Sequence, residues 1–334
     1  MSTQSSVQMD EMLKILFHLS RKPTIHLVNG LFHEAFELHD QLTITHLNVE
    51  YTQKRLTNSY QTKRSDKVLQ VKNNDDVFHY HLEFQLKNDS TMPYRMFDYG
   101  CCIAEECQKS IGTYDKFVFP RQLVLFIEED EKIPDFLSME LHFTSGGFHY
   151  QVPVEKYWKQ DVNQLMKRNL YALLPIQPFN YRKNLNKILD RKPSKNRDEE
   201  IRAILDKIQD EVKILVEIII GYYNRDELTF DDTDKMLIVL TNVTEHVFQK
   251  NSEYHIIKKE VDNMINTLWS PVKERKVRVE AFKELIYDVL QDKNLDTQNE
   301  ELRTKLNKID DPNQMKQLAR RVHNVKKIDD LFSK

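Results

Sequence analysis

Three polar residues in the first third of the chain have the types and spacing needed for metal-assisted hydrolysis. Asp66 opens a short apolar run, and Glu83 and Gln85 lie two positions apart in a second run, where alternate residues of a strand share a face. Carboxylates suit hard cations such as Mg²⁺, and an amide can hold a water molecule by hydrogen bonds. We therefore expect Asp66 and Glu83 to bind Mg²⁺ and Gln85 to orient the attacking water.

The two runs that carry these residues are predicted to form a β-hairpin. The first spans 64–71 ("RSDKVLQV"), and the second alternates between apolar and polar residues from position 78 to 86. Its apolar face consists of Phe78, Tyr80, Leu82, Phe84 and Leu86, and its polar face consists of His79, His81, Glu83 and Gln85. The segment between the runs, Asn73–Asp76, has residue types that tolerate tight turns.

Two other interpretations of the same residues stay open. The polar face of the second strand could simply meet solvent, with Asp66 belonging to a turn. Alternatively, His79, His81 and Glu83 share a face and could bind zinc or iron, provided that a further histidine comes from elsewhere in the sheet.

The surrounding sequence resembles the PD-(D/E)XK nuclease superfamily and, more closely, the bacterial recombination-promoting nuclease and transposase family. The resemblance runs through "RSDKVLQV", "YHLEFQ" and "STMPYRMFDYG", and more weakly through "PRQLVLFIEED", "YQVPVEKYW" and "LYALLPIQPF". Together these segments cover roughly residues 5 to 190. The resemblance implies a restriction-endonuclease-like mixed sheet flanked by helices, and a Mg²⁺-dependent DNA endonuclease linked to recombination or mobile elements.

By this resemblance Asp66 and Glu83 take the two acidic motif positions, and Gln85 stands where the superfamily pattern has lysine. Glutamine can hydrogen-bond a water molecule but brings no positive charge. The substitution predicts slow cleavage or a preference for Mn²⁺. Arg95, at the start of the next predicted helix, is a candidate either for placing a phosphate or for a structural ion pair.

The resemblance also implies a further acid before the hairpin. Glu34, Glu37 and Glu50 are the candidates, and no motif distinguishes them. Glu34 and Glu37 lie three apart and would share a face of a helix. Glu34 is the favoured candidate.

Composition predicts a globular cytoplasmic protein. The 334 residues are 40% hydrophobic and 30% charged, with a formal net charge of −3. The longest apolar run, Ile214–Tyr223, is too short to span a bilayer, and the first residues lack the pattern of a signal peptide. Three cysteines (Cys101, Cys102 and Cys107) lie within one predicted helix and are expected to be buried thiols. The net charge gives no global sign of DNA binding, but the segment 54–72 is basic and leads into the predicted metal-binding strand.

The order of predicted elements indicates an α/β fold with a mixed sheet. We expect helices at 8–20, 28–38 and 94–110, a strand at Leu42–Gln53, a buried strand at 122–129 parallel to a neighbour, and a hairpin around Gly146–Gly147. No glycine-rich phosphate loop occurs, which disfavours nucleotide-binding folds.

From about Trp158 onward the chain is predicted to be helical. A linker at Arg191–Lys195 divides a nuclease-like domain (1–190) from an all-helical C-terminal region (191–334). Helices are expected at 196–223, 231–250, 253–268 and 274–292, with a further helix starting at Asp311-Pro312. This region could bind DNA or a protein partner, form a homo-oligomer, or serve stability alone.

Overall fold

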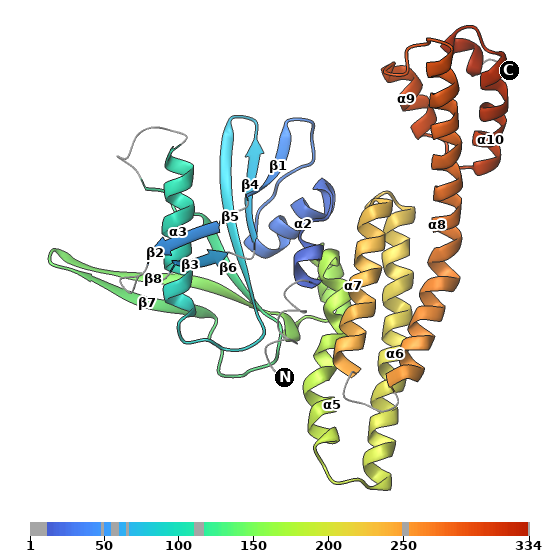
Figure 1. Cartoon of the computed structure of the whole chain (residues 1–334). Coiled ribbons are helices and arrows are strands. Elements are labelled where there is room, and N and C mark those ends of the chain that lie inside the picture. Colours follow the sequence, from blue (N-terminus) through green and yellow to red (C-terminus); the bar gives the residue numbers. More distant parts are fainter. Residues whose placement is uncertain are drawn as a thin grey trace. The chain divides into compact units, whose positions relative to one another are not determined.

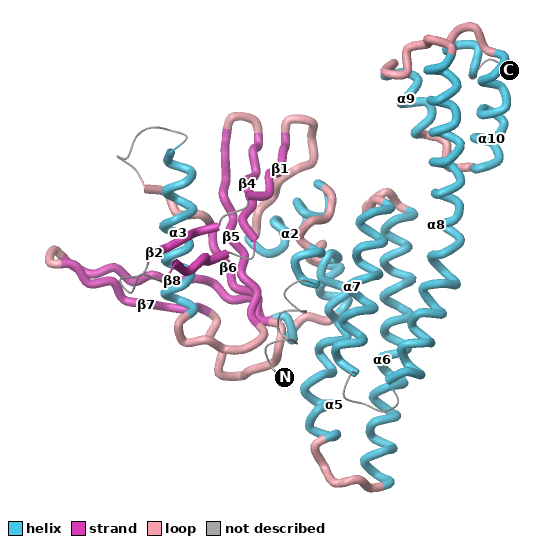
Figure 2. The backbone as a smooth tube through the Cα atoms, viewed as in Figure 1, coloured by secondary structure: helices cyan, strands magenta, loops and turns pink. Residues whose placement is uncertain are grey.

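The computed structural model describes residues 12–47, 50–54, 60–64, 67–109, 117–248 and 254–332. The chain divides into two compact units, Met1–Val261 and Asp262–Lys334. Every strand of the described residues belongs to the first unit (Figure 2). The division predicted at 190, from the composition of the segment Arg191–Lys195, stays a prediction.

The first unit contains, among its described residues, a six-stranded mixed sheet in the order β1-β4-β5-β6-β8-β7 (Figure 1). Its strands are β1 (Leu42–Leu47), β4 (Lys67–Asn73), β5 (Asp76–Gln85), β6 (Arg121–Phe126), β7 (Phe136–Phe143) and β8 (Gly146–Lys156). The pairs β5–β6 and β6–β8 are parallel and the other pairs are antiparallel. The predicted α/β class with a mixed sheet and flanking helices is confirmed.

The hairpin β4–β5 forms as predicted. Asn73 is the Cα partner of Asp76, so Asn74 and Asp75 alone make the turn. Asn74 has a φ of +56°, a left-handed conformation that asparagine tolerates better than most residues. The hairpin β7–β8 is also confirmed, with Phe143 paired to Gly146.

Helices cover both faces of the central strands. The α3 helix (Met92–Lys109) crosses one face, where Met92 and Met96 pack into a cluster with Val124 and Phe126. The opposite face carries α2 (Arg21–Phe32), whose Ile25 and Val28 pack in a cluster with Leu69, Val71 and Tyr80. Because both faces are covered, the polar face of β5 meets protein, and the expectation that it could simply meet solvent is wrong.

The helix predicted at 28–38 lies earlier in the chain, at Arg21–Phe32. It ends at Phe32 because His33 adopts a left-handed φ of 56°. Asn29 then fastens the following segment: its side-chain nitrogen donates to the Phe36 carbonyl at 2.9 Å, and its oxygen accepts from the Phe36 amide at 3.0 Å. The prediction that Glu34 and Glu37 share a helical face is therefore wrong.

The strand predicted at Leu42–Gln53 is two strands. β1 ends at Leu47 and pairs with β4 in the large sheet. β2 (Glu50–Lys54) pairs instead with β3 (Tyr60–Arg64) in a separate two-stranded sheet. Alternation along the sequence could not reveal this change of partner.

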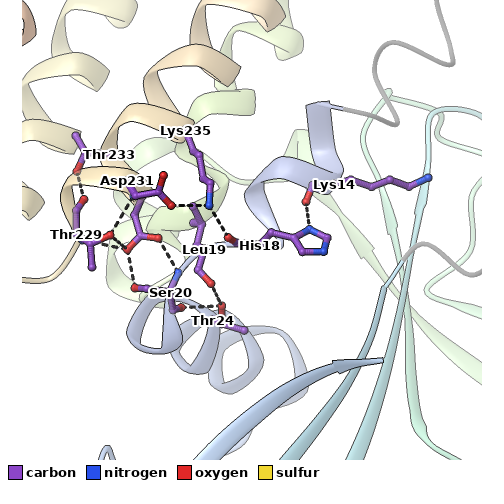
Figure 3. A network of polar contacts seen from close by, with 10 residues as sticks. Lys14, His18, Leu19, Ser20, Thr24, Thr229, Asp231, Thr233 and Lys235 are labelled. Atoms are coloured by element: carbon purple, nitrogen blue, oxygen red, sulfur yellow. Dashed lines mark hydrogen bonds and ion pairs between the residues drawn. The ribbon is translucent and has the colours of Figure 1, made fainter. Parts of the chain in front are cut away.

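The start of α2 is tied to a helix more than 200 positions away. Asp232 of α7 (Phe230–Phe248) accepts from the Ser20 amide and hydroxyl, both at 2.6 Å, and from the Thr229 amide and hydroxyl at 3.0 and 2.7 Å. Figure 3 shows Ser20 and Thr229 converging in this network. Ser20 makes no side-chain cap within its own helix, because its hydroxyl donates instead to this carboxylate, which anchors the start of α2.

Helical segments complete the first unit. They are η1 (Tyr157–Lys159), α4 (Val162–Lys167), η2 (Tyr171–Tyr181), α5 (Arg182–Leu189), α6 (Lys195–Asn224) and α7. The predicted apolar stripe of α6 is confirmed as buried, and it consists of Ile201, Ile204, Leu205, Ile208, Val212 and Leu215. Ser194, in the segment predicted as a linker, caps this helix by accepting from the Arg197 amide at 3.2 Å.

The second unit is helical, as predicted for this part of the chain. α8 (Tyr254–Asp292) begins in the last residues of the first unit and is one helix with Pro271 inside it, so the prediction of two separate helices at 253–268 and 274–292 is wrong. It is followed by α9 (Glu300–Asn307), α10 (Pro312–Arg321), η3 (Val322–Asn324) and η4 (Ile328–Leu331). The predicted start of α10 is confirmed, with Asp311 as its cap and Pro312 in the first turn. None of the described helices combines the length and apolar character required to cross a bilayer.

Candidate functional site

Glu83 is a buried carboxylate at the centre of the sheet. It lies on β5 opposite Val124 of the parallel strand β6, and its side chain is 1% exposed. Its position between two neighbouring strands and beneath α3 excludes most water. An ionised carboxylate in such a place requires hydrogen bonds or a counter-charge to offset its lost hydration.

A chain of buried hydrogen bonds leads from β8 to this carboxylate. Tyr150 donates its hydroxyl proton to Gln122 Oε1, and Gln122 Nε2 lies 3.0 Å from His81 Nδ1 and 2.7 Å from the Met96 carbonyl. His81 Nε2 lies 2.9 Å from Glu83 Oε1.

The directions of these bonds follow from the donors available. The Gln122 amide has two protons, one for the Met96 carbonyl and one for His81, so His81 Nδ1 must accept. His81 is then the neutral tautomer that carries its proton on Nε2 and donates it to Glu83. The chain therefore supplies a donor to Oε1 of the carboxylate without bringing a charge.

A cation approaches the other carboxylate oxygen. Arg95 Nη2 lies 3.8 Å from Glu83 Oε2, and Arg95 Nη1 lies 3.3 Å from Asp89 Oδ2. Asp89 also accepts from the Thr91 amide and hydroxyl, at 2.9 and 2.8 Å, just before α3 begins. Burial opposes ionisation of Asp89, but hydrogen bonds from Thr91 and Arg95 outweigh it and lower the pKa of this carboxyl. Arg95 thus takes part in structural ion pairs while its side chain stays one-third exposed.

The two histidines of β5 form hydrogen bonds with neighbouring side chains. Both ring nitrogens of His81 are occupied, and His79 Nε2 lies 3.0 Å from Gln70 Nε2. Burial lowers the pKa of His79. Within the described ranges, no set of three His, Cys, Asp or Glu side chains is arranged to hold a metal ion. The structure therefore gives no support to a zinc or iron site at His79, His81 and Glu83.

Of the predicted catalytic residues, Glu83 and Gln85 share the α3 face of β5. Gln85 is half-buried at the end of the strand, and its carbonyl accepts from the Ile127 amide at 2.9 Å. Asp66 lies outside the described residues. β4 is described from Lys67, which is the Cα partner of Leu82, the residue next to Glu83.

The favoured third acid, Glu34, lies elsewhere. It forms an ion pair with Arg121, whose Cα partner is Tyr80 and whose guanidinium lies 5.8 Å from the Phe78 ring. Phe78 and Tyr80 belong to the face of the sheet opposite Glu83, so the structure does not bring Glu34 and Glu83 together. Of the other two candidates, Glu37 is exposed in the segment after α2, and Glu50 begins β2 as the Cα partner of Arg64.

A second buried titratable group lies on that opposite face. Lys67 is 4% exposed, and its Nζ has no hydrogen-bond partner among the described residues. Burial lowers the pKa of this amine to about 7. Burial, followed by the nearby Lys67 charge, also lowers the pKa of His46 to about 4.

The sequence analysis did not find Gln122 or Tyr150. The signal for Gln122 was present, because it is an amide directly before the apolar run Leu123–Ile127, in a segment predicted to form a buried strand. A polar side chain in a strand buried on both faces requires a partner in the protein. Tyr150 had no comparable signal, since tyrosine is common on ordinary half-buried strands. The three cysteines lie on α3 as predicted, but they are only partly buried.

Comparisons with protein-family models, with curated protein sequences and with solved structures find no match.

Proposed function

We propose that this chain is a metal-dependent endonuclease that hydrolyses DNA phosphodiesters, with a role in recombination or mobile-element movement. The observation that carries the proposal is Glu83: a carboxylate buried in the middle of a mixed sheet, beside a parallel strand, with a guanidinium 3.8 Å from Oε2. The resemblance of the hairpin and the helix after it to PD-(D/E)XK nucleases supports the same assignment.

In this proposal Asp66 and Glu83 hold Mg²⁺ or Mn²⁺. Carboxylate oxygens are hard donors that fit either cation. The bound ion would lower the pKa of a water molecule and stabilise negative charge on the phosphate. His81 keeps Glu83 in one orientation by holding Oε1, which leaves Oε2 as the oxygen directed toward Arg95.

Two further side chains have roles beside the carboxylates. Gln85 lies on the same face as Glu83 and holds the attacking water through its amide. Arg95 is partly exposed and can exchange its contact with Asp89 for a DNA phosphate, which guanidinium groups bind in a bidentate manner.

The test is nicking of supercoiled plasmid with Mg²⁺ and, separately, with Mn²⁺. The wild-type chain is compared with Asp66→Asn, Glu83→Gln and Glu140→Gln, all purified identically. Glu140 is the matched control, because it is a more than half-exposed glutamate of β7. We expect cleavage by wild type and Glu140→Gln, no cleavage by the other two variants, and loss of all cleavage in EDTA.

Cleavage that persists equally in Asp66→Asn and Glu83→Gln would contradict the proposed site and point to a contaminating nuclease. Absence of cleavage with either metal would contradict the activity itself.

A second candidate function is a nuclease-like protein that no longer cleaves and instead binds DNA or a protein partner through its helical region. The observation that favours it is the buried chain from Tyr150 to Glu83, in which the donor from His81 to Oε1 offsets part of the cost of burying the carboxylate. Titration with Mn²⁺ separates the two. An endonuclease binds Mn²⁺ and loses that binding in Asp66→Asn, whereas the second candidate shows no binding that depends on this residue.

A further inference from the structure

The α10 helix of the second unit has one buried face and one exposed face. Met315, Leu318 and Ala319 pack into a hydrophobic cluster with side chains of α8 and α9, and Figure 1 shows the two short helices beside the end of α8. The exposed residues of α10 are all polar, and they are Asn313, Gln314, Lys316, Gln317, Arg320 and Arg321. α10 therefore presents a wholly polar surface to its surroundings.

The charge of this surface is entirely positive. From Pro312 to Lys327 the sequence holds five cations and no acid, although acidic residues outnumber basic ones in the whole chain by 52 to 49. The five cations are Lys316, Arg320, Arg321, Lys326 and Lys327, and all of them are exposed. A stretch without acids gives a local positive potential, which attracts a polyanion.

Two cations of α10 differ from the cations of a neighbouring helix, where an acid balances the charge. Lys305 of α9 lies 2.7 Å from Glu301, one turn earlier in the same helix. Within the part of the second unit that the structure describes, no acid forms an ion pair with Lys316 or Arg320. Asp311, the acid just before α10, caps the helix by accepting a backbone amide. Pairs one turn apart are usual on a solvated helix, so the lack of them here favours a face that meets an anionic partner.

The order of the side chains around α10 suits the reading of a base sequence. At 3.6 residues per turn, Asn313, Gln317 and Arg320 lie along the line opposite the buried face, and Lys316 and Arg321 lie on either side of it. Asparagine and glutamine form paired hydrogen bonds with adenine, and arginine does so with guanine, in the major groove of DNA. Cations beside such a line are placed to meet phosphates.

Duplex DNA fits this face better than the other candidate partners. Its major groove is about 12 Å wide and admits an α-helix, whereas the major groove of duplex RNA is too narrow. Single strands bind by stacking on aromatic rings, and residues 308–321 contain no aromatic residue. A protein partner would require an apolar centre of the interface, which the exposed face of α10 lacks.

We propose that α10 is a recognition helix that enters the major groove of duplex DNA, with Asn313, Gln317 and Arg320 toward the bases and Lys316 toward a phosphate. The short connection 308–311 between α9 and α10 has the length found in helix-turn-helix motifs, in which the second helix reads the groove. The inference rests on the proposed function for the biological role of the DNA, and it adds a binding element in the second unit.

The test is the fluorescence anisotropy of a short labelled DNA duplex of mixed sequence, titrated with the full chain. EDTA is present throughout, so that cleavage plays no part. Unlabelled duplex RNA and single-stranded DNA of the same sequence serve as competitors, and we expect both to compete less well than duplex DNA. Methyl green, which occupies the major groove, should prevent binding, whereas netropsin, which occupies the minor groove, should not.

The variants Lys316→Ala and Arg320→Ala are expected to weaken duplex binding. Loss of one phosphate contact lowers the slope of log affinity against log salt by about 0.9, which corresponds to about eightfold weaker binding at about 0.1 M salt. Lys195→Ala and Arg202→Ala are the matched controls, because they remove the same charges from exposed positions of α6 in the first unit. Their affinities should equal that of wild type. Since all four side chains are exposed, the core stays intact, which circular dichroism checks.

Absence of duplex binding would overturn the inference. So would equal affinities of the α10 variants and their controls, tighter binding of duplex RNA or single-stranded DNA, or prevention of binding by netropsin alone. Binding in EDTA that depends on Lys316, together with no plasmid cleavage in either metal, retains this inference while the proposed function fails. Plasmid cleavage by wild type, with unchanged DNA affinity in Lys316→Ala and Arg320→Ala, retains the proposed function while this inference fails.

Discussion

His81 Nε2 lies 2.9 Å from Glu83 Oε1, and both side chains are 1% exposed or less. Since Gln122 occupies His81 Nδ1 with a donor, the imidazole is held in one neutral tautomer that gives its proton to the carboxylate. The relationship ties the orientation of Glu83 to an amide on the neighbouring strand. Residues that never contact Glu83 therefore help to determine its geometry.

Replacing Gln122 should destabilise the first unit. Gln122→Leu leaves His81 Nδ1, the Tyr150 hydroxyl and the Met96 carbonyl without their present partner. Each buried polar group that loses its hydrogen bond costs roughly 1–3 kcal/mol, so we expect a loss of about 3 kcal/mol in the free energy of unfolding. Urea denaturation measures it. The control is Gln151→Leu on β8, where the exposed amide predicts a change within about 0.5 kcal/mol; equal effects of the two variants would contradict the buried network.

Lys67 should make stability depend on alkaline pH. Burial lowers its pKa in the folded protein from 10.5 to about 7. Below pH 7 both the folded and the unfolded state carry the proton, so the destabilisation is full and constant. Between about pH 7 and 10.5 the unfolded state binds more protons, so the free energy of unfolding rises with pH, by at most about 1.4 kcal/mol per pH unit.

Lys67→Met should abolish this rise in stability with pH and should raise the free energy of unfolding at pH 7. The reason is that an apolar side chain of similar length replaces a buried amine. Urea denaturation at pH 7 and pH 9 measures the difference. Lys72→Met, at an exposed position of the same strand, provides the reference. If Lys67→Met and Lys72→Met show the same pH dependence, Lys67 is not a buried amine of lowered pKa.

Asp232 should be among the most important polar residues for stability. Its carboxylate accepts two hydrogen bonds from Ser20 and two from Thr229, and it is 1% exposed. Asp232→Ala removes all four at once, and we expect a loss of about 3–5 kcal/mol. Asp231→Asn, which breaks only an exposed pair with Lys235, should cost less than about 1 kcal/mol. Thermal unfolding of the two variants, measured side by side, shows whether the long-range bonds between Asp232 and Ser20 stabilise the fold by this amount.

Two helical glycines should respond oppositely to alanine. Helix propensity favours alanine over glycine by about 1 kcal/mol. At Gly221 of α6 a Cβ would meet only the Arg225 guanidinium, at 3.4 Å, so Gly221→Ala should stabilise by up to that amount. At Gly100 of α3 it would lie 2.5 Å from the Phe119 ring, and overpacking of about 1–3 kcal/mol should outweigh the propensity gain. Chemical denaturation measures the change in the free energy of unfolding for each variant. Stabilisation by Gly100→Ala would contradict the prediction and show that Phe119 moves freely.

Local sequence signals predicted the elements that depend on local chemistry. Asn73–Asp76 specified a tight turn, and Asp311-Pro312 specified a helix start, because the side chains themselves make the required conformation. The buried run around Val124 likewise indicated a strand covered on both faces.

Tertiary contacts determined what the sequence analysis missed. α2 ends at the left-handed His33, and Asn29 then bonds the backbone of Phe36; apolar spacing reveals neither feature. α8 continues through Pro271 despite the lost backbone hydrogen bond, and Trp269, two residues earlier, is fully buried. The burial of Glu83 required α3 to cover the polar face, and Gln122 to meet His81 across strands. The spacing of residues along one strand does not show which helix covers that strand or which side chain on the next strand it contacts.

The bond between Ser20 and Asp232 spans 212 positions of the chain. During synthesis, the segment that begins α2 leaves the ribosome long before Asp232, the residue that anchors it, and loop closure over such a distance must await most of the first unit. Neighbouring strands of the sheet can therefore pair early, whereas the bonds that hold the start of α2 form late. We therefore expect α2, one of the first helices to be synthesised, to be one of the last to be fixed in its native position.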